Sequence, residues 1–240
     1  IALPKTKLHM KNPAIQRRTF LKTTAAAATG ITVIPSHVMG KALGHMAPSD
    51  KLNIAGVGIG GKGRVNLRAM NTENIVALCD VDWAYSDRVF KKYSKAKKYK
   101  DFRKMYDEMG SSIDAVVVAT ADHTHAIVAA QAMAMGKHAY VQKPLTHTVY
   151  ESRLLTHLAA KNKVATSMGN QGSSGEGVNL TTEWIANGEV GDITKVEAFT
   201  DRPIWPQGLN KPEEEMTPPS TLDWDLFIGP AKPRPYNEAY

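Results

Sequence analysis

The chain has 240 residues, a formal net charge of +7, a sequence pI of about 9.4 and a single cysteine, Cys79. Hydrophobic residues make up 42% and charged residues 22%, which is typical of a globular protein and excludes collagen-like and coiled-coil sequences. One cysteine excludes an internal disulfide and a cysteine-cluster zinc site. A basic protein usually binds nucleic acid or an anionic membrane, so the position of the charge matters.

The excess positive charge lies at the amino terminus. The first carboxylate is Asp50, and seven of the 30 basic residues precede it, which leaves 23 bases and 23 acids in the rest of the chain. These seven are Lys5, Lys7, Lys11, Arg17, Arg18, Lys22 and Lys41. A body without net charge and without a basic aromatic strip argues against nucleic-acid binding.

The leader, residues 1–47, carries paired arginines followed by an uncharged run. Gln16–Lys22 reads QRRTFLK, and Thr23–Ile34 consists of small and apolar residues. This order is typical of a bacterial twin-arginine export signal, and the run of about 12 residues is shorter than the roughly 20 that span a bilayer. We therefore expect a periplasmic protein that uses the twin-arginine export machinery, starts at Met10 and has no stable membrane anchor. A basic arm ahead of a short core helix is the alternative.

From Lys51 on, short apolar runs alternate with helical patterns. Continuous β-branched runs of this length are typical of buried parallel strands, and apolar residues three and four apart predict the helices between them. The order predicts an α/β fold with a doubly wound parallel sheet. The predicted strands are Leu52–Val57, Ile75–Cys79, Ala115–Ala119, Ala139–Val141 and Val164–Met168; the predicted helices are Lys62–Met70, Trp83–Tyr93, Phe102–Glu108, His125–Met135 and Val149–Asn162.

The pattern changes after the fifth predicted strand. We place a domain boundary near Gly169, with the sheet domain over residues 50–168 and the beginning of a C-terminal α+β domain over residues 169–240. The elements expected in the second part are a helix over Gly175–Ala186, an alternating strand over Ile193–Thr200 and a long proline-rich loop over Pro203–Pro235.

A glycine-rich turn joins the first strand to the first helix. Gly58, Gly60 and Gly63 form a GxGxxG pattern; Gly56, Gly58 and Gly61 give a second register, which would place the first glycine inside the strand. In the preferred register the first glycine permits a tight turn, the second lets the backbone approach a pyrophosphate, and the third lets helix and strand pack closely. The pattern predicts a dinucleotide site, and a glycine turn of purely structural use is the alternative.

The second predicted strand is followed by a carboxylate. Asp80 follows Gly58 by 22 residues, the spacing at which an acidic side chain accepts hydrogen bonds from the adenosine ribose. A carboxylate there repels a 2′-phosphate, so the sequence predicts NAD in preference to NADP. Asp82 is a second candidate for the same role. Turn and carboxylate together predict a Rossmann-type NAD-binding domain.

Two further segments narrow the choice of family. Ala115–His125 reads AVVVATADHTH, and Gly136–Pro144 reads GKHAYVQKP. From about Lys51 onward the chain resembles the Gfo/Idh/MocA oxidoreductases, which show an ATPxxxH-like turn and a GKHVxVEKP segment. The resemblance implies NAD-dependent oxidation of a secondary alcohol in a carbohydrate, such as C3 of a sugar or glycoside, with a tightly bound cofactor. We also expect a homo-oligomer.

The resemblance assigns roles to residues near the nicotinamide. Thr120, Asp122 and His125 would line the nicotinamide side of the cofactor, and Lys143 would be the catalytic residue beside the nicotinamide and the reacting carbinol. A lysine ammonium can hold the substrate hydroxyl and stabilise an alkoxide as hydride leaves. The alternatives are a solvated lysine at a strand end and a histidine satisfied by the backbone at a helix start.

One position departs from the family pattern. Gln142 replaces the family's glutamate, and a neutral amide can hydrogen-bond but cannot shift the proton affinity of its neighbour as a negative charge does. Gln142 remains a candidate cofactor-binding residue. Its presence either marks a subfamily or weakens the acid–base network of the site. His123 and His138 match no motif, and we expect them to be structural.

Downstream, the resemblance is to exported members of the family and places four residues where the substrate pocket would form: Asn170, Gln171, Asp201 and Trp205. Amides and a carboxylate suit sugar hydroxyls, and an indole suits stacking on a pyranose; loop capping or core packing is the alternative for each. Leu222–Leu226 is expected to be structural, because a tryptophan flanked by apolar residues usually packs. The scattered histidines predict no metal site.

Three functions stay open. The first is a periplasmic NAD-dependent sugar oxidoreductase. The second is an NAD-dependent glycosidase that oxidises C3 transiently, eliminates the aglycone and reduces again. The third is a non-catalytic carbohydrate-binding protein, which Gln142 would suit. The family's Asp-x-x-x-His proton acceptor has no match between Lys143 and Tyr240 and is expected beyond Tyr240.

Overall fold

The computed structural model describes residues 50–202, 208 and 210–239. Lys51–Tyr240 forms one compact unit. The predicted leader, with its paired arginines and its start at Met10, lies outside the described residues, and so does Trp205. Among the described helices, none combines the length and the apolar character needed to cross a membrane.

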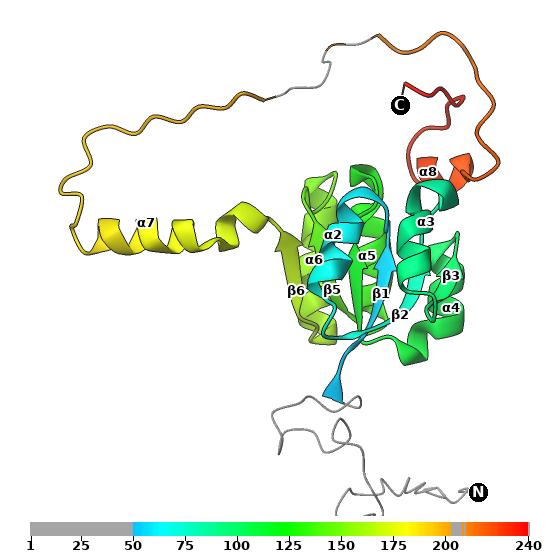
Figure 1. Cartoon of the computed structure of the whole chain (residues 1–240), viewed down its shortest axis with the longest axis horizontal. Helices are drawn as coiled ribbons and strands as arrows, with labels where there is room; N and C mark the ends of the chain where they lie inside the picture. The colour runs from blue at the N-terminus through cyan, green and yellow to red at the C-terminus, as the bar shows by residue number, and fades with distance from the viewer. Residues whose placement is uncertain (1–49, 203–207, 209, 240) are drawn as a thin grey trace, which may run out of the picture. The chain divides into compact units, whose positions relative to one another are not determined.

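Six parallel strands form one sheet in the order β3-β2-β1-β4-β5-β6 (Figure 1). The chain proceeds outward in one direction from β1 to β3 and in the other from β4 to β6, and ligands bind such sheets where this direction changes. The predicted doubly wound Rossmann fold is confirmed. The strands are β1 (Asn53–Val57), β2 (Asn74–Cys79), β3 (Lys97–Tyr99), β4 (Ala115–Val118), β5 (His138–Gln142) and β6 (Thr166–Gly169).

Helices follow the strands as the sequence predicts. The bounds of α2 to α7 agree with the predicted ones to within about two residues, and α8 is not predicted. The helices are α2 (Gly61–Ala69), α3 (Trp83–Lys92), α4 (Phe102–Met109), α5 (His125–Ala134), α6 (Val149–Asn162), α7 (Glu176–Ala186) and α8 (Trp224–Ile228), and the short 3₁₀ turns are η4 (Gly110–Ser112), η5 (Asp122–Thr124) and η6 (Gln171–Ser174).

The sheet is apolar on both faces, because successive strand residues point to opposite sides. On one side, Val57 and Val118 pack with buried residues of α4, α5 and α6. On the other side, Ile54, Leu78 and Val117 pack with buried residues of α2 and α3. The two layers fix the strand ends, and the loops after these ends carry the site.

Side-chain caps set the residues at which several helices begin. Asp82 Oδ1 accepts hydrogen bonds from the first turn of α3, and Asp101 Oδ1 accepts one from Arg103 N in α4. Thr148 and Glu151 form a capping box at the start of α6. Asp82 and Asp101 follow the ends of β2 and β3 closely, so the turns after these two strands are short.

The sequence pattern misses β3. Its residues, Lys97–Tyr99, include two lysines, and the strand pairs only with β2 at the edge of the sheet. Edge strands are often short and charged, since charge discourages pairing with other chains, so they lack the apolar pattern of buried strands.

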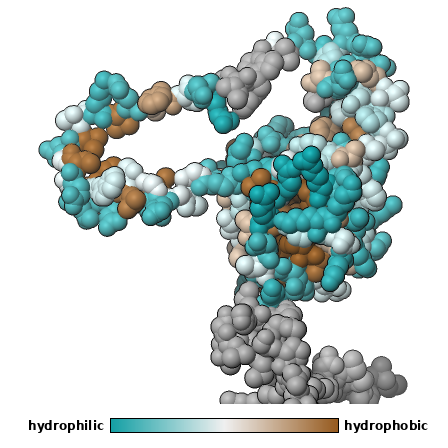
Figure 2. Space-filling model, viewed as in Figure 1, coloured by the Kyte–Doolittle hydropathy of each residue, from teal (hydrophilic) through white to brown (hydrophobic). Residues whose placement is uncertain are grey.

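The predicted strand over Ile193–Thr200 is wrong. Residues 193–200 form no strand, and Val196 and Phe199 are 82% and 97% exposed. Figure 2 shows apolar side chains on the surface of this part of the chain. Alternation alone does not make a strand, because its backbone groups need a neighbouring strand, and within the described residues this segment pairs with none.

The predicted loop over Pro203–Pro235 contains a helix, so a loop throughout this segment is also wrong. Asp223 caps α8 by accepting a hydrogen bond from Leu226 N at 3.1 Å. The Trp224 ring stacks on Phe227, with centroids 5.1 Å apart, which confirms the predicted packing of Leu222–Leu226. The sheet ends with β6 at Gly169, and a domain boundary there stays a prediction.

Candidate functional site

The turn between β1 and α2 requires glycine. Gly58 has a φ of +73°, and a Cβ there would lie 2.5 Å from the backbone N of Thr120, which follows β4. A Cβ on Gly63 would collide with the Gly58 carbonyl oxygen. The turn therefore packs against the end of β4 and against its own helix. No described side chain caps α2, so the N–H groups of its first turn can face an anionic ligand.

Asp80, directly after β2, holds this turn in place. Its Oδ2 accepts hydrogen bonds from Ile59 N at 2.8 Å and Gly60 N at 3.1 Å. The same oxygen accepts one from the Ser86 hydroxyl at 2.6 Å, and Oδ1 accepts one from Asp82 N at 3.0 Å. The side chain is only 8% exposed. Four donors orient the carboxylate, and Oδ1 retains room for a further donor such as a ribose hydroxyl.

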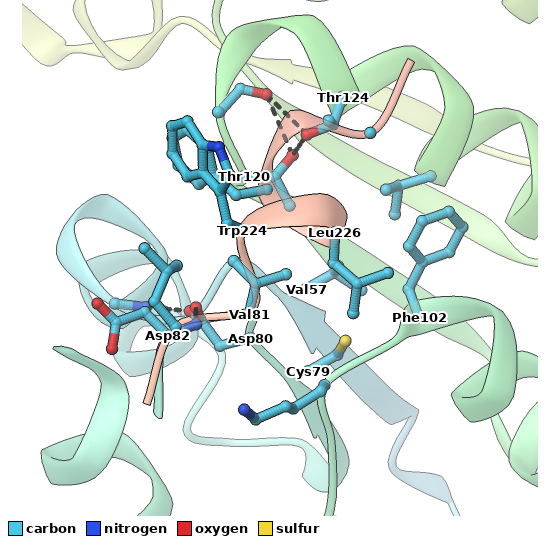
Figure 3. Close-up of a pocket in the computed structure, with 18 of the residues that line it drawn as sticks. Val57, Cys79, Asp80, Val81, Asp82, Phe102, Thr120, Thr124, Trp224 and Leu226 are labelled. Carbon is cyan, nitrogen blue, oxygen red and sulfur yellow. Dashed lines mark hydrogen bonds between the residues drawn. The ribbon is translucent and has the colours of Figure 1, made fainter. Parts of the chain in front are cut away.

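A cavity of about 840 Å³ lies beside the turn, at the carboxyl ends of β1, β2 and β4 (Figure 3). This volume is in the range of cofactor and small-molecule sites. The cavity brings together four predicted site residues: Gly58, Gly60, Asp80 and Thr120. Its apolar lining includes Val57, Cys79, Val81, Phe102, Ile127, Val128, Leu226 and Phe227.

Cys79 contributes an apolar surface to this cavity. Burial raises the pKa of its thiol well above the ordinary value, and the nearby Asp80 and Asp101 carboxylates raise it further. The thiol therefore stays protonated at neutral pH and is not a nucleophile.

A second polar cluster lies at the end of β5. Gln142 is 5% exposed, and its Oε1 accepts hydrogen bonds from Gln171 Nε2 at 3.1 Å and from Lys143 N at 3.3 Å. Gln171 Nε2 also donates to the Tyr140 hydroxyl at 3.0 Å. Within the described residues, Gln142 Nε2 has no partner, so a buried amide donor is available to a ligand. Lys143, the next residue, is exposed.

His125 links the turns after β4 and β5. The ring is buried, with Nδ1 2.6 Å from the carbonyl oxygen of Pro144 and Nε2 3.1 Å from that of Thr120. Its two nitrogens therefore face the backbone, and the imidazole sets the spacing between Thr120 and the turn that carries Lys143. Direct cofactor contact by His125 stays a prediction.

A comparison with known protein families identifies the domain that contains this sheet. The sequence model of the Gfo/Idh/MocA family, described as "Oxidoreductase family, NAD-binding Rossmann fold", matches residues 52–170. These residues are the NAD-binding Rossmann domain of that family. The predicted family resemblance and the predicted cofactor, NAD, are confirmed at this level.

Solved structures share the fold. Scyllo-inositol dehydrogenase from Lactobacillus casei, with bound NAD(H) and scyllo-inositol, matches 60% of this chain and 43% of its own at a TM-score of 0.54 and 21% identity. Myo-inositol 2-dehydrogenase from Lactobacillus plantarum matches the same shares at a TM-score of 0.55 and 20% identity.

Curated relatives include glycosidases. An α-N-acetylgalactosaminidase of Shewanella oneidensis is 25% identical over 210 residues, which are 77% of this chain and 45% of the relative. A glycosyl hydrolase family 109 protein of Akkermansia muciniphila is 29% identical over 168 residues, 65% of this chain and 34% of the relative. The chain thus spans less than half the length of these relatives.

The residues of the Rossmann domain fit NAD. The glycine turn brings backbone close to the cavity, α2 presents the N–H groups of its first turn, and Asp80 Oδ1 can accept from the ribose. The Tyr85 ring, 67% exposed, lies against Gly60 and Gly61 and borders the same side of the cavity. These residues would hold the pyrophosphate and the adenosine ribose.

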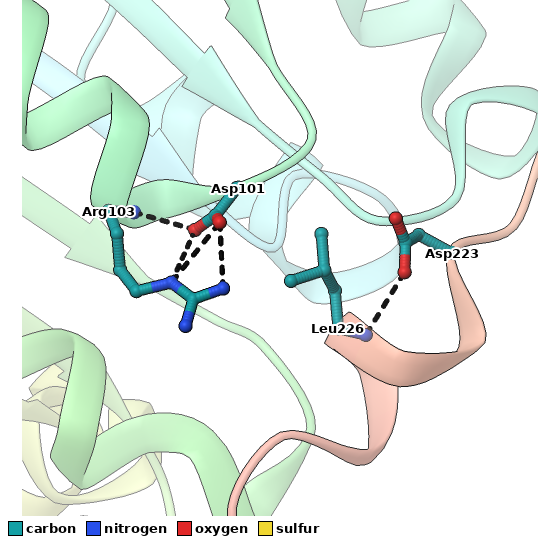
Figure 4. A network of polar contacts seen from close by, with 4 residues as sticks. All are labelled: Asp101, Arg103, Asp223 and Leu226. Carbon is teal, nitrogen blue, oxygen red and sulfur yellow. Dashed lines mark hydrogen bonds and ion pairs between the residues drawn. The ribbon is translucent and has the colours of Figure 1, made fainter.

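Two carboxylates close to the glycine turn disfavour a 2′-phosphate. Asp80 and Asp82 line the cavity, and both carboxylates would repel a phosphate. The basic residues that line the cavity are Lys62, Lys100 and Arg103, and Asp101 binds the guanidinium of Arg103 at 2.7 Å (Figure 4). Hydrogen bonding from Arg103 lowers the pKa of Asp101, which keeps the carboxylate charged and the arginine engaged.

Other predicted site residues lie apart from the NAD cavity. Asp122 begins η5 and is exposed, and Asn170 is also exposed, with its Nδ2 donating to Ser173 Oγ at 2.9 Å. Asp201 is exposed. Their roles, like those of Gln142, Lys143 and Gln171, stay predictions. Across the described ranges, no three His, Cys, Asp or Glu side chains are grouped so as to hold a metal ion.

Sequence analysis misses the apolar half of the NAD cavity. Phe102 belongs to an expected helix start, but nothing in its spacing indicates that it borders a ligand. Leu226 and Phe227 come from α8, more than a hundred residues beyond the glycine turn. The only available signal for α8 is an N-capping aspartate before an apolar run.

Two glycines with the same backbone angle provide a test of the turn. Gly58 and Gly136 have φ of +73° and +74°, but a Cβ on Gly136 would meet nothing within 4 Å. We expect Gly136→Ala to lower the free energy of unfolding by about 1–2 kcal/mol, the strain of the left-handed conformation. Gly58→Ala should cost about 1–3 kcal/mol more and weaken NAD binding, because its Cβ meets rigid backbone.

Denaturant unfolding and calorimetric titration with NAD measure both effects, and Gly136→Ala is the matched control. Equal losses of stability together with equal NAD affinity in the two variants would contradict the role of Gly58.

Proposed function

We propose that the chain is part of an NAD-dependent oxidoreductase that oxidises a secondary alcohol of a sugar or glycoside, with C3 as the reacting carbon. The observation that carries this proposal is the polar cluster after β5, where exposed Lys143 adjoins the buried amide of Gln142. The inositol dehydrogenases among the structural neighbours and the glycosidases among the relatives support a polyhydroxylated substrate.

Lys143 would hold the substrate in this proposal. Its ammonium can donate to the reacting hydroxyl and stabilise negative charge on that oxygen as the carbon loses hydride. Bound NAD supplies the hydride acceptor. The Lys143 backbone N–H donates to Gln142 Oε1, and His125 contacts the carbonyl of Pro144, so the turn is held on both sides of the lysine.

Gln142 and Gln171 would orient a neighbouring hydroxyl. Among the residues that the structure describes, the Nε2 group of Gln142 has no partner and is a buried donor, and the Oε1 of Gln142 accepts a hydrogen bond from Gln171. Because Gln142 is neutral, it can position a substrate oxygen without competing for the proton of the reacting hydroxyl.

A transient oxidation is the second candidate. The glycosidase relatives favour a cycle in which C3 is oxidised, the C2 proton becomes acidic and the aglycone is eliminated; water then adds at C1 and the C3 carbonyl is reduced again. Such a cycle returns the cofactor to NAD and releases the aglycone without net NADH.

Replacement of Lys143 by methionine in the intact protein tests the proposal. We expect kcat/KM on sugars and aryl glycosides to fall by roughly 10²–10⁴-fold, because the group that stabilises the alkoxide is lost, while NAD affinity is unchanged. Lys161→Met, on the exposed surface of α6, is the control. NADH absorbance and release of a chromogenic aglycone, recorded together, distinguish net oxidation from glycoside cleavage.

Two results would contradict this assignment. One is full activity in Lys143→Met. The other is sugar binding by the wild-type protein with neither NADH formation nor aglycone release, which would favour a carbohydrate-binding protein.

We also propose that the protein reaches the periplasm through the twin-arginine machinery, because the leader pairs Arg17 and Arg18 ahead of an uncharged run. A periplasmic enzyme must carry its nicotinamide cofactor with it, which fits a tightly held NAD.

Conservative replacement of both leader arginines by lysine tests the export route. Arg17→Lys/Arg18→Lys keeps the charge, so we expect it to retain the protein in the cytoplasm, while the control Lys11→Arg, in the same leader, leaves export intact. Cell fractionation and immunoblotting measure the distribution, and normal export of the double-lysine variant would exclude this route.

A further inference from the structure

Residues 221–237, which include α8, form a strap over one end of the NAD cavity. The strap begins beside the segment that follows β2: Asp223 N donates to Val81 O at 2.9 Å, and Trp83 N donates to Thr221 O at 3.2 Å. Asp82 and Leu222 form an antiparallel bridge between these hydrogen bonds. The strap is therefore attached by backbone hydrogen bonds directly next to Asp80.

His123 attaches the other end of α8 to the turn after β4. Its Nε2 lies 3.0 Å from the carbonyl oxygen of Phe227 and 3.1 Å from that of Ile228. The His123 and Phe227 rings meet edge to face, with centroids 6.1 Å apart. The imidazole thus connects the strap to η5, and the strap bridges the ends of β2 and β4.

The strap also has an internal framework that fixes its shape. Trp224 stacks on Phe227 and meets the Tyr236 ring edge-on at 5.1 Å. The indole Nε1 donates to Arg234 O at 2.8 Å, and Asp223 caps α8 at Leu226 N (Figure 4). Aromatic packing and the capped helix α8 therefore hold the strap in a defined shape, although the strap contains no strand of the sheet.

The inner surface of the strap is mainly apolar, with Asp225 and Asn237 as its polar members, and faces the adenosine half of the site. Leu226 points from α8 into the cavity, on the side of Phe102 (Figure 3), and Phe227 lines it as well. Asp80, the candidate ribose acceptor, lines the same cavity, whereas Gln142 and Lys143 do not. An apolar slot beside a ribose acceptor suits a planar adenine base.

We propose that the strap forms the outer wall of the adenine pocket and slows release of NAD, with His123 as the positioning residue that holds it closed. The proposal rests on NAD binding and is independent of the sugar chemistry. An adenine base enclosed between the carboxyl ends of the strands and α8 leaves only when the contacts between His123 and α8 open. The strap thereby offers a physical means of retaining the cofactor.

Release of NAD and of ADP-ribose from the full chain tests this proposal. We expect His123→Ala and Leu226→Ala each to speed release of both ligands by about tenfold, since each loses a contact that closes the slot. ADP-ribose lacks the nicotinamide, so equal acceleration for both ligands places the effect at the adenosine half. His123→Gln retains a side-chain donor and should restore most of the retention.

The matched controls are His138→Ala, whose ring contacts the backbone of Ala165 at the opposite ends of the strands, and Leu180→Ala on α7. Both should release NAD as the wild type does. Hydrogen exchange in the wild type gives a readout that needs no variant: ADP-ribose should slow exchange of the amides of residues 221–229.

Unchanged release in both His123→Ala and Leu226→Ala would overturn the proposal, as would acceleration for NAD alone. Absence of ADP-ribose protection in residues 221–229 would overturn it as well. Loss of sugar turnover without a change in these binding measurements would affect only the proposed activity.

Discussion

One buried carboxylate holds the NAD site together. Asp80 accepts hydrogen bonds from two backbone groups of the glycine turn, from Ser86 of α3 and from the backbone at Asp82. A buried charge is costly unless donors surround it, so the turn and the start of α3 must adopt positions that satisfy it. The donors that stabilise Asp80 thereby place the phosphate-binding turn, and the carboxylate keeps capacity for a ribose hydroxyl.

The other parts of the site depend on this placement through contacts between turns. Gly58 lies against Thr120 after β4, and His125 connects Thr120 to the turn that carries Lys143. His123, two residues before His125, connects the same region to α8. Two histidines two residues apart thus contact different parts of the site: His125 contacts the turn beside Lys143, and His123 contacts the strap.

Much of this arrangement is local in sequence and could be predicted. The glycine turn, the carboxylate after the second strand and the alternation of strands and helices each occupy a short window, and the fold class follows from them. Lys97–Tyr99 could not be recognised, because an edge strand with two lysines lacks an apolar pattern. The strand expected over residues 193–200 does not form for a different reason: the alternating pattern is present, but this segment has no partner strand within the described part of the chain.

The strap could not be predicted, since its contacts join residues far apart along the chain. His123 and Phe227 are separated by 104 positions, and no spacing rule links a turn histidine to the carbonyl groups of a distant helix. The sequence predicts a structural role for His123, and the contacts of His123 with α8 connect it to the cofactor cavity.

The central claim is that the carboxylates of Asp80 and Asp82 make the site bind NAD in preference to NADP. Calorimetric titration of the purified protein with NAD and with NADP tests it most directly, because the two differ only in the 2′-phosphate. The account predicts that NAD binds at least about 100-fold more tightly, as like charges in a partly buried site cost several kcal/mol. NADP binding as tight as that of NAD would contradict it.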